Sequence, residues 1–333
     1  MKSRADLRPG AAGEPVRELQ RRLSALGFDP AGDSPGVFGA GTEAAVRAFQ
    51  TARGLLVDGT CGRETWGTIV ESGWALGDRL LYLRRPVQRG DDVAELQRRL
   101  NALGFDAGRE DGLLGPETAA ALRAFQRNVG LADDGICGRT TVAALSRLGA
   151  VAGEEGSVAQ LREREDLRHG PHGIAARRIY IAAAPGFEAL GDRVTRGLLG
   201  VGASALLDPA GRPESEIAAT ANRYDAALLV ALGAGDRPGV RCAYFESGRF
   251  RSESGYRVAT AITDGLRTVL PRTETPVGRT YSLLRETRMA AVSCELAGPD
   301  DVAGFGEVVS HAGAVAGTIV RGVRAVFDSP PPA

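Results

Sequence analysis

The sequence predicts a multidomain protein in which two small three-helix domains precede an α/β domain with an open sheet. Three observations predict it. A segment of the first half recurs 76 or 77 residues later, apolar residues in both copies recur at helical spacing, and short apolar strands alternate with helices in the second half. A chain of 333 residues is long enough for two or three domains.

The repeat defines the first two domains. Three segments of the first copy return in the second: residues 16–29 as 93–106, 42–50 as 118–126, and 57–63 as 133–139. Three matches in the same order indicate a duplicated domain. We therefore place one domain at residues 1–76 and another at residues 77–149.

Apolar residues within each copy stand at the spacing of short helices. In the second copy they stand three, four and three residues apart, at Val93, Leu96, Leu100 and Leu103, which makes one apolar stripe along a helix. Asp91 and Asp92 stand where an N-cap is expected, Gly104 ends the stripe, and Pro116 suits the first turn of the next helix. Each copy is thus predicted to be a compact three-helix domain.

Both copies resemble the peptidoglycan-binding module that is common in cell-wall hydrolases. The resemblance covers residues 5–73 and 82–148 and rests on an LQRRL helix, a TAxAxRAFQ helix and Asp-Gly-x-x-Gly turns. It implies a shallow groove for a glycan or stem peptide beside the loops, with five candidate contact residues: Asp111, Gly112, Gln126, Asp134 and Gly135. Helix caps and turns alone would also explain the glutamine and the Asp-Gly pairs. The first copy has Ser34-Pro35-Gly36 at the first of these loops, where the second has Glu110-Asp111-Gly112.

Composition disfavours several classes of partner. The formal net charge is zero, so no overall basic field would attract nucleic acid or anionic lipid. No stretch reaches about 18 uninterrupted apolar residues, and the first residues contain no apolar run typical of a signal peptide. We therefore expect no membrane span and a cytoplasmic location. The four cysteines include no CxxC pair and are expected to be reduced thiols.

The second half predicts an open sheet with a mostly parallel core. Residues 150–176 are rich in glycine and charge and are predicted to be a linker, residues 177–328 the α/β domain, and residues 329–333 a tail. The first expected strand begins at residue 178, and further strands are expected at residues 204–207, 227–232 and 290–296. Helices are expected at residues 188–199, 214–223 and 259–269, followed by a final helix that ends near residue 327.

Two segments of this half resemble the zinc-dependent N-acetylmuramoyl-L-alanine amidases, which hydrolyse the lactyl-amide bond of peptidoglycan. Residues 219–232 and 283–296 match the family's segments in order and spacing, and the resemblance extends over about residues 177–327. It implies a zinc ion held by three protein ligands, with a water in the open position and a glutamate that moves protons.

The family's ligands are not found at the matching positions. The first histidine belongs in a turn that here includes Phe187, and the second belongs at Gly233. Glu188 is the possible remnant of a glutamate ligand, and Glu295 matches the catalytic glutamate. Of the three histidines, His169 and His172 precede the first strand and His311 lies in the last helical region. We therefore expect that zinc has been lost and that Glu295 is vestigial, kept for a hydrogen bond or a partner contact.

Two binding modules ahead of such a degraded domain resemble the cytoplasmic amidase-like regulators of peptidoglycan precursor synthesis in actinobacteria. The resemblance implies a non-catalytic protein that binds peptidoglycan or a muropeptide-like precursor. It also implies a protein partner, the UDP-N-acetylglucosamine enolpyruvyl transferase, and control through phosphorylation. Two alternatives stay open at this point: a divergent zinc amidase that hydrolyses peptidoglycan, and a simple wall-binding protein with an inert second half.

Overall fold

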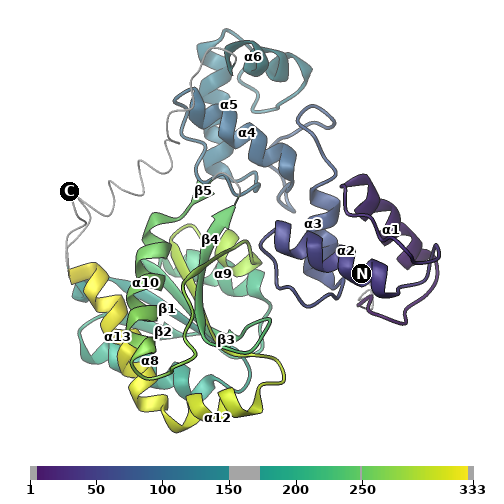
Figure 1. Cartoon of the computed structure of the whole chain (residues 1–333). Coiled ribbons are helices and arrows are strands. Elements are labelled where there is room, and N and C mark those ends of the chain that lie inside the picture. Colours follow the sequence, from purple (N-terminus) through teal and green to yellow (C-terminus); the bar gives the residue numbers. More distant parts are fainter. Residues whose placement is uncertain (1–5, 150–172, 248–249, 329–333) are drawn as a thin grey trace. The chain divides into compact units, whose positions relative to one another are not determined.

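The computed structural model describes residues 6–149, 173–247 and 250–328. The chain divides into an N-terminal unit with helices α1 to α6 and a C-terminal unit with a seven-stranded sheet (Figure 1). This arrangement confirms the predicted fold class. Most of the predicted linker, residues 150–172, and the predicted tail, residues 329–333, lie outside the described residues.

The N-terminal unit consists of two three-helix modules. The helices of the first are α1 (Glu14–Ala25), α2 (Ala40–Ala52) and α3 (Arg63–Glu71), and those of the second are α4 (Asp91–Ala102), α5 (Pro116–Asn128) and α6 (Arg139–Gly149). Each module has its own hydrophobic core. An edge-to-face pair of phenylalanines recurs in both cores, with ring centroids 5.4 Å apart for Phe28 and Phe49 and 5.5 Å apart for Phe105 and Phe125. The duplication seen in the sequence therefore extends to side-chain packing.

The start of α4 differs from the prediction. Gly90 occupies the N-cap position, and Asp91 and Asp92 lie in the first turn of the helix. Asp92 is buried and accepts a hydrogen bond from Arg79 Nε at 2.7 Å, so its carboxylate serves an ion pair rather than a cap. Acidic residues remain favourable there because the helix dipole is positive at its N-terminus.

Four buried glutamines hold the loops of the two modules, and we call them the glutamine locks: Gln20, Gln50, Gln97 and Gln126. In each lock the side-chain amide donates to a loop carbonyl and to the hydroxyl of a threonine on the next helix, while its oxygen accepts from a loop glycine N–H. For Gln126 these partners are Ile136, Thr141 and Gly135, at 3.1, 3.3 and 2.9 Å. Each module therefore contains the same lock twice, once between each pair of successive helices.

The C-terminal unit contains one mixed sheet. Its strands are β1 (Arg178–Ala183), β2 (Ser204–Leu207), β3 (Leu228–Ala234), β4 (Arg241–Ser247), β5 (Phe250–Arg251), β6 (Val277–Arg279) and β7 (Ala290–Ala297). Their order is β2-β1-β3-β7-β4-β5, and β6 also pairs with β4. The neighbours β2, β1, β3 and β7 run parallel, as predicted, whereas β4 runs antiparallel to β7. The carboxyl ends of β1, β3 and β7 consequently meet at one edge of the sheet.

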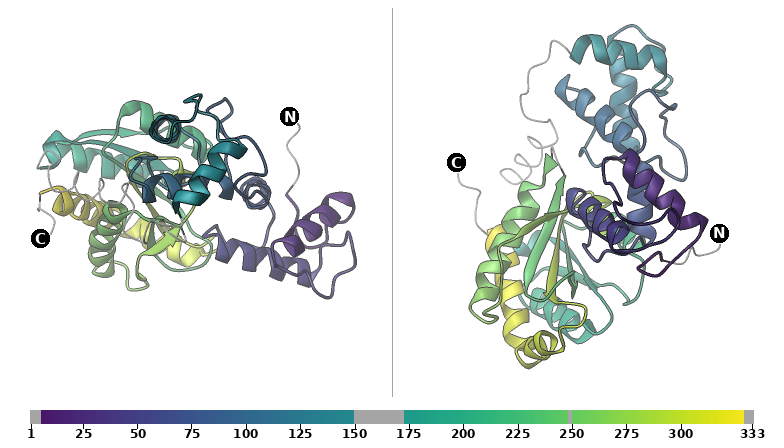
Figure 2. Two further views of the ribbon diagram at one scale, coloured as in Figure 1. Left: turned by 90° about the horizontal axis from the view of Figure 1, so that it is seen from above. Right: turned by 45° about the vertical axis from the view of Figure 1, so that its right-hand side comes forward.

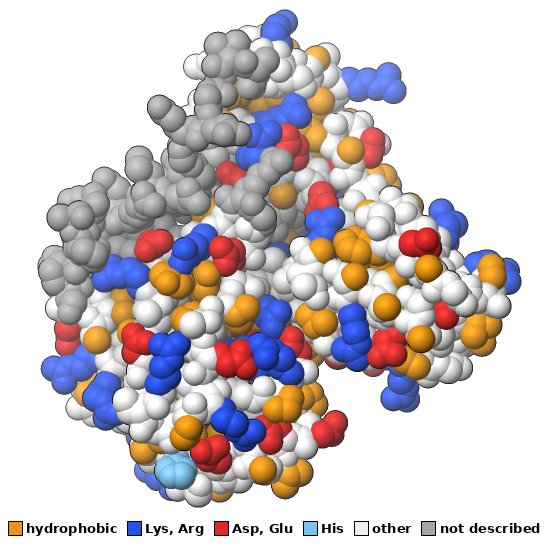
Figure 3. Space-filling model, in the orientation of Figure 1, with side chains coloured by type: hydrophobic (Ala, Val, Ile, Leu, Met, Phe, Trp, Pro, Cys, Tyr) orange, Lys and Arg blue, Asp and Glu red, His pale blue; other side chains and the backbone are white. Residues whose placement is uncertain are grey.

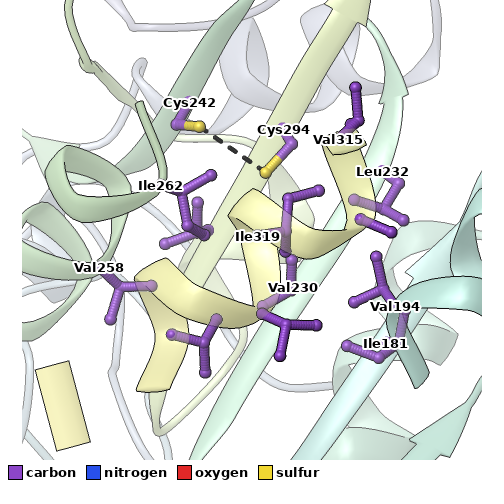
Figure 4. Packing of buried hydrophobic residues seen from close by; sticks show 14 of the residues in the cluster. Ile181, Val194, Val230, Leu232, Cys242, Val258, Ile262, Cys294, Val315 and Ile319 are labelled. Atoms are coloured by element: carbon purple, nitrogen blue, oxygen red, sulfur yellow. Dashed lines mark hydrogen bonds between the residues drawn. The ribbon is translucent and has the colours of Figure 1, made fainter. Parts of the chain in front are cut away.

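Helices cover both faces of this sheet. On one face a layer of three helices covers the strands (Figure 2). These helices are α8 (Glu188–Gly200), α10 (Glu253–Arg267) and α13 (Ala312–Asp328). Their apolar side chains pack on alternate residues of the strands, and in Figure 4 Val258, Ile262, Val315 and Ile319 surround Val230 and Cys294. Contacts on the other face come from α9 (Glu214–Tyr224) and α11 (Ser282–Arg285), while α12 (Val302–Ser310) follows β7.

Residues 174–176, which the sequence analysis assigns to the linker, form the short helix η1 (Ile174–Ala176). Ile174 is buried in the core of the C-terminal unit, and its backbone N–H donates to Asp328 at the end of α13. These contacts belong to the C-terminal unit.

The surface of the described residues is of mixed charge. Acidic and basic side chains are interspersed over the face seen in Figure 3, in agreement with the formal net charge of zero. No helix within the described ranges combines the length and apolar character needed to cross a bilayer.

Candidate functional site

Two positions singled out from the sequence, Gly233 and Glu295, converge at the carboxyl edge of the sheet beside Ala184. Gly233 near the end of β3 pairs in register with Glu295 of β7. A Cβ atom added to Gly233 would lie 3.2 Å from the Cβ of Ala184, the residue that follows β1. The ends of three adjacent strands thus bring Ala184, Gly233 and Glu295 together, which is where parallel sheets place their functional groups.

The turn after β1 is closed by an aromatic pair. Phe187 is buried, and its ring packs edge-to-face on Phe305 of α12 with centroids 5.3 Å apart. Such a contact adds to the stabilisation from burial alone. Phe187 therefore belongs to the hydrophobic core.

Glu188 begins α8 and lies on the surface. Its Oε2 accepts a hydrogen bond from the backbone N–H of Gly186 at 2.8 Å. The carboxylate therefore holds the turn that precedes its own helix.

Glu295 is buried among polar partners on the same edge. Its carboxylate accepts a hydrogen bond from the Tyr281 hydroxyl, and its Oε2 lies 3.5 Å from Arg241 NH1. Burial raises the pKa of Glu295 above its ordinary value, although the Tyr281 hydrogen bond and the guanidinium groups of Arg279 and Arg241 act in the opposite direction. Burial and the neighbouring Glu295 carboxylate raise the pKa of Tyr281 as well.

These groups are part of a larger buried cluster, which we call the edge ion cluster: Asp236, Arg241, Arg279 and Glu295. Asp236 lies between the two arginines, 2.7 Å from Arg241 NH1 and 2.9 Å from Arg279 NH2. Arg241 is 1% exposed, and its NH2 also donates to the backbone oxygens of Arg237 and Pro238. A buried charge is tolerated when it is paired and hydrogen-bonded in this way. The cluster therefore fixes the loop after β3 against β4 and β7.

The residues at this edge do not fit a zinc ion. Zinc in hydrolases is held by histidine or carboxylate ligands in a fixed geometry, whereas glycine and alanine stand at two of the three converging positions and Glu295 is held by Tyr281 and faces Arg241. Among the described residues there is no group of three or more His, Cys, Asp and Glu side chains placed to hold a metal.

His311, which lies within the described ranges, does not supply a metal donor at this edge. His311 lies on the surface between α12 and α13, where its Nδ1 is 2.9 Å from the backbone oxygen of Glu307. His169 and His172 lie outside the described residues.

Sequence reasoning missed the partners of Glu295. Arg241, Asp236 and Tyr281 lie in segments for which no element was predicted. Nothing in their spacing relates Asp236 and Arg241, or Tyr281 nearer to β7, to the Glu295 carboxylate. One signal was present: Arg241 opens the run Cys242-Ala243-Tyr244-Phe245, which has the apolar and aromatic composition of a buried strand.

Four of the five candidate contact residues of the second module lie in two loops, and Gln126 lies in α5. Gln126 is buried and its amide donates to Asp134 as well as to the lock partners, so its hydrogen-bonding groups point inward. Asp111 takes the equivalent place beside Gln97. Gly112 and Gly135 have φ near +74° and +73°, a backbone conformation that glycine adopts without strain. Asp134 is exposed, and a backbone N–H bond from Ile136 together with the Gln126 bond lowers the pKa of its carboxyl.

Comparison with known proteins finds several matches. Residues 12–69 and 89–145 each match the family model of a peptidoglycan binding domain. An N-acetylmuramoyl-L-alanine amidase of Mycobacterium tuberculosis, CwlM, is 35% identical over 332 residues, covering 87% of this chain and 81% of that protein. The amidase CwlL of Bacillus licheniformis is 34% identical over 163 residues, covering 43% of this chain and 45% of that protein. The solved structure of an N-acetylmuramoyl-L-alanine amidase from Clostridium difficile 630 is 15% identical with a TM-score of 0.40, covering 47% of this chain and 100% of the other.

Proposed function

The chain belongs to the N-acetylmuramoyl-L-alanine amidase family, with two peptidoglycan-binding domains ahead of an amidase-like domain, and we propose that it is a member that does not hydrolyse peptidoglycan. In this proposal the chain is a pseudoenzyme that binds wall fragments or their precursors. It regulates the synthesis of cell-wall precursors through a protein partner in the cytoplasm.

One observation carries the non-catalytic part of the proposal. The strand ends that meet at the carboxyl edge present Gly233 and Ala184, which have no metal ligand in their side chains, and the Glu295 carboxylate is engaged by Tyr281 and faces Arg241. A zinc-dependent hydrolase needs three fixed ligands and a general base that reaches the bound water. In this proposal the ligand positions at Phe187 and Gly233 and the freedom of the base are lost together.

Elemental analysis and an amidase assay test this part. The full chain is incubated with one equivalent of ZnCl2, dialysed and analysed for zinc, and the release of stem peptides from purified peptidoglycan is measured beside an active zinc amidase. We expect no stoichiometric zinc and no release. One equivalent of tightly held zinc, with hydrolysis that Glu295→Ala abolishes, would instead establish the chain as an amidase.

We place the contact with wall fragments at the two loops of the second module that carry Asp111, Gly112, Asp134 and Gly135, beside Gln126 of α5. Because the Gln126 side chain is bonded within the lock, it shapes the loop, and direct contacts fall to Asp134 and to the loop backbone. Calorimetric titration of the full chain with a soluble disaccharide-peptide tests this placement. Asp134→Ala is expected to weaken binding more than Asp58→Ala, its counterpart in the first module.

The cytoplasmic setting in this proposal agrees with the cysteines of the chain. All four are buried and unbridged, with the sulfur atoms of Cys242 and Cys294 3.7 Å apart, and free thiols are typical of proteins in a reducing compartment. The partner in this proposal is the UDP-N-acetylglucosamine enolpyruvyl transferase.

A steady-state assay tests the partner. The transferase from the native host is assayed with and without an excess of the full chain, and with the chain after treatment by a serine/threonine kinase of that host. We expect at least a twofold change in kcat/KM in one of these states. An unchanged rate and no complex in analytical ultracentrifugation would exclude this partner.

A further inference from the structure

The second module carries an apolar surface that the first module lacks. Leu81 forms an isolated antiparallel bridge with Cys137, and both side chains are buried. The residues on either side of an antiparallel bridge point to the opposite face. On that face Leu80 is 57%, Tyr82 39% and Ile136 38% exposed.

The first module is an internal reference for this surface. Its equivalent bridge joins Leu7 and Cys61, both buried, and the flanking residues are Asp6, Arg8 and Thr60. The correspondence extends to side-chain placement. A Cβ atom on Gly62 would lie 3.4 Å from Asp6 Oδ1, and a Cβ atom on Gly138 would lie 3.4 Å from Leu80 Cδ2.

One backbone thus carries three polar residues in the first copy and three large apolar residues in the second. The fold does not require the apolar residues, because the first copy is built without them. Leaving them exposed has a solvation cost that contact with a partner would remove.

A loop with further exposed side chains begins directly after Tyr82. The segment between the bridge residue Leu81 and the N-cap Gly90 is three residues longer than the segment between Leu7 and the N-cap Gly13 in the first module. Buried Gln88 pins the loop, since its Oε1 accepts from Tyr82 N–H at 2.8 Å and its Nε2 donates to the Leu80 oxygen at 3.0 Å. The added loop is therefore held in place before any partner binds, which lowers the entropic cost of association.

Leu83, Arg84, Arg85 and Val87 are all exposed on this loop. Within the part of the chain that the structure describes, neither Arg84 nor Arg85 forms an ion pair with a carboxylate. Two unneutralised guanidinium groups thus flank five exposed apolar side chains, and we call the whole the module-2 patch: Leu80, Tyr82, Leu83, Arg84, Arg85, Val87 and Ile136.

We propose that the module-2 patch is a docking surface for an acidic protein segment that carries apolar side chains. The apolar residues bury the partner's aliphatic or aromatic side chains, and Arg84 and Arg85 pair with its carboxylates. Aromatic, aliphatic and arginine side chains together are the composition of the centre of protein interfaces. The patch belongs to the N-terminal unit, and the proposal does not depend on what the carboxyl edge of the sheet does.

A sugar chain and a membrane fit the patch less well. Four of its seven side chains are purely aliphatic and offer no hydrogen bond to sugar hydroxyl groups, whose desolvation would then be uncompensated. Adsorption to an anionic bilayer draws on a cluster of four to eight basic residues or a broad positive field, whereas the formal net charge of the chain is zero.

A selection experiment tests the proposal. Random twelve-residue peptides displayed on phage are selected on the full chain and counter-selected on the triple variant Leu80→Asp, Tyr82→Arg, Ile136→Thr. These substitutions install the first module's own residues, so the fold tolerates them at equivalent positions. We expect enriched peptides that combine Asp or Glu with Leu, Ile or Phe. Measured by fluorescence anisotropy, they should bind the parent chain at least tenfold more tightly than the triple variant.

A second variant keeps the test decisive if the first one is destabilised. Arg84→Glu with Arg85→Glu changes only exposed side chains and should also weaken peptide binding at least tenfold, whereas Arg127→Glu elsewhere on the module should not. Peptides that bind all variants equally, or no enrichment at all, would overturn the proposal. The proposal would also be overturned if the parent chain bound a soluble disaccharide-peptide or phosphatidylserine vesicles and the triple variant did not.

Discussion

Arg241 and Glu295 face each other across the antiparallel strands β4 and β7, with Arg241 NH1 3.5 Å from Glu295 Oε2 and both side chains almost fully buried. In this family a glutamate at the end of this strand is expected to serve catalysis, and here its nearest cation is a guanidinium instead of a metal. The positive charge that stabilises a buried carboxylate is thus supplied by the chain itself. The edge ion cluster is a structural element, and its removal has a measurable cost.

Arg241→Met should destabilise the C-terminal unit by about 3 kcal/mol, because it leaves the buried carboxylates of Asp236 and Glu295 with Arg279 as the remaining cation of the edge ion cluster. Hydrogen exchange of the β3 and β7 amides, followed by mass spectrometry, measures the loss. The control is Arg237→Met, which removes an exposed pair with Glu274 and should change stability by less than about 1 kcal/mol. Equal losses of stability in the two variants would show that the edge ion cluster stabilises the fold no more than an exposed ion pair does.

Phe187→Ala should destabilise the same unit by about 3 kcal/mol or more, since it opens a cavity beside Phe305. The same hydrogen-exchange measurement applies, with Val302→Ala as control because Val302 is 83% exposed. If the Phe187 variant kept its stability and gained zinc affinity, this turn would be a disguised ligand position rather than part of the core.

Gln126→Ala should destabilise the second module by about 2 to 4 kcal/mol, because it removes four hydrogen bonds. The Thr141 hydroxyl and the backbone N–H of Gly135 then each lose their bond to the glutamine. Urea unfolding followed by hydrogen exchange of the α5 and α6 amides provides the measurement. Arg127→Ala, next to it in sequence but 60% exposed, serves as control. A loss of ligand binding without a loss of stability would contradict the role of the lock.

The pKa of Glu95 predicts how the stability of the second module depends on pH. Burial acts to raise the pKa of Glu95, but hydrogen bonds from Arg98 and Arg99 outweigh it and lower the pKa to about 2. A depressed carboxyl pKa contributes stability that is present above its ordinary value of 4.5 and is lost as pH falls toward 2. Glu95→Gln should therefore cost about 1 kcal/mol at pH 7, and parent and variant should converge between pH 4.5 and 2. A difference that stays constant over this range would mean that the ion pairs contribute nothing.

The thiols should be inert in the folded chain. All four cysteines are buried. Burial raises the pKa of Cys137 to about 12, and the contact with Cys242 together with burial raises that of Cys294 well above its ordinary value. Because the thiolate is the reactive form, Ellman's reagent at pH 8 should find no rapidly reacting thiol in native protein and four in 6 M guanidinium chloride. A fast native reaction would indicate local opening of the core.

The sequence was sufficient for the elements with regular apolar patterns. Strand β3 is a continuous apolar run, β7 is mostly apolar, and α8 and α9 have an apolar stripe, so both kinds of segment could be predicted. Strand β4 was missed because Arg241 at its start and Glu246 near its end interrupt the pattern. Those charges are tolerated only because Asp236 and Tyr244 meet them in space, and such pairing is a property of the tertiary structure.

The candidate site was predictable only in part for a related reason. Ala184, Gly233 and Glu295 stand at strand ends, and parallel strands bring their ends together, so their convergence follows from the order of elements. Tyr281 and Arg279 reach Glu295 from β6 and the turn after it. That segment is too short to leave a periodic signal.

The glutamine locks also determine the order in which the chain acquires structure. The lock contacts span short stretches of sequence: 15 residues for Gln50 and Gln126, 22 for Gln20 and 21 for Gln97. The pairing of β3 with β7 spans a longer stretch, because Leu228 pairs with Ala290. Short loops close quickly and long ones slowly, so proteins with local contacts fold faster. During synthesis from the N-terminus at about 5 to 20 residues per second, each module completes its contacts as soon as it leaves the ribosome. The sheet stays open until its last strand has been translated, and a nascent chain stalled before residue 290 would expose that unfinished sheet to chaperones while both modules are already folded.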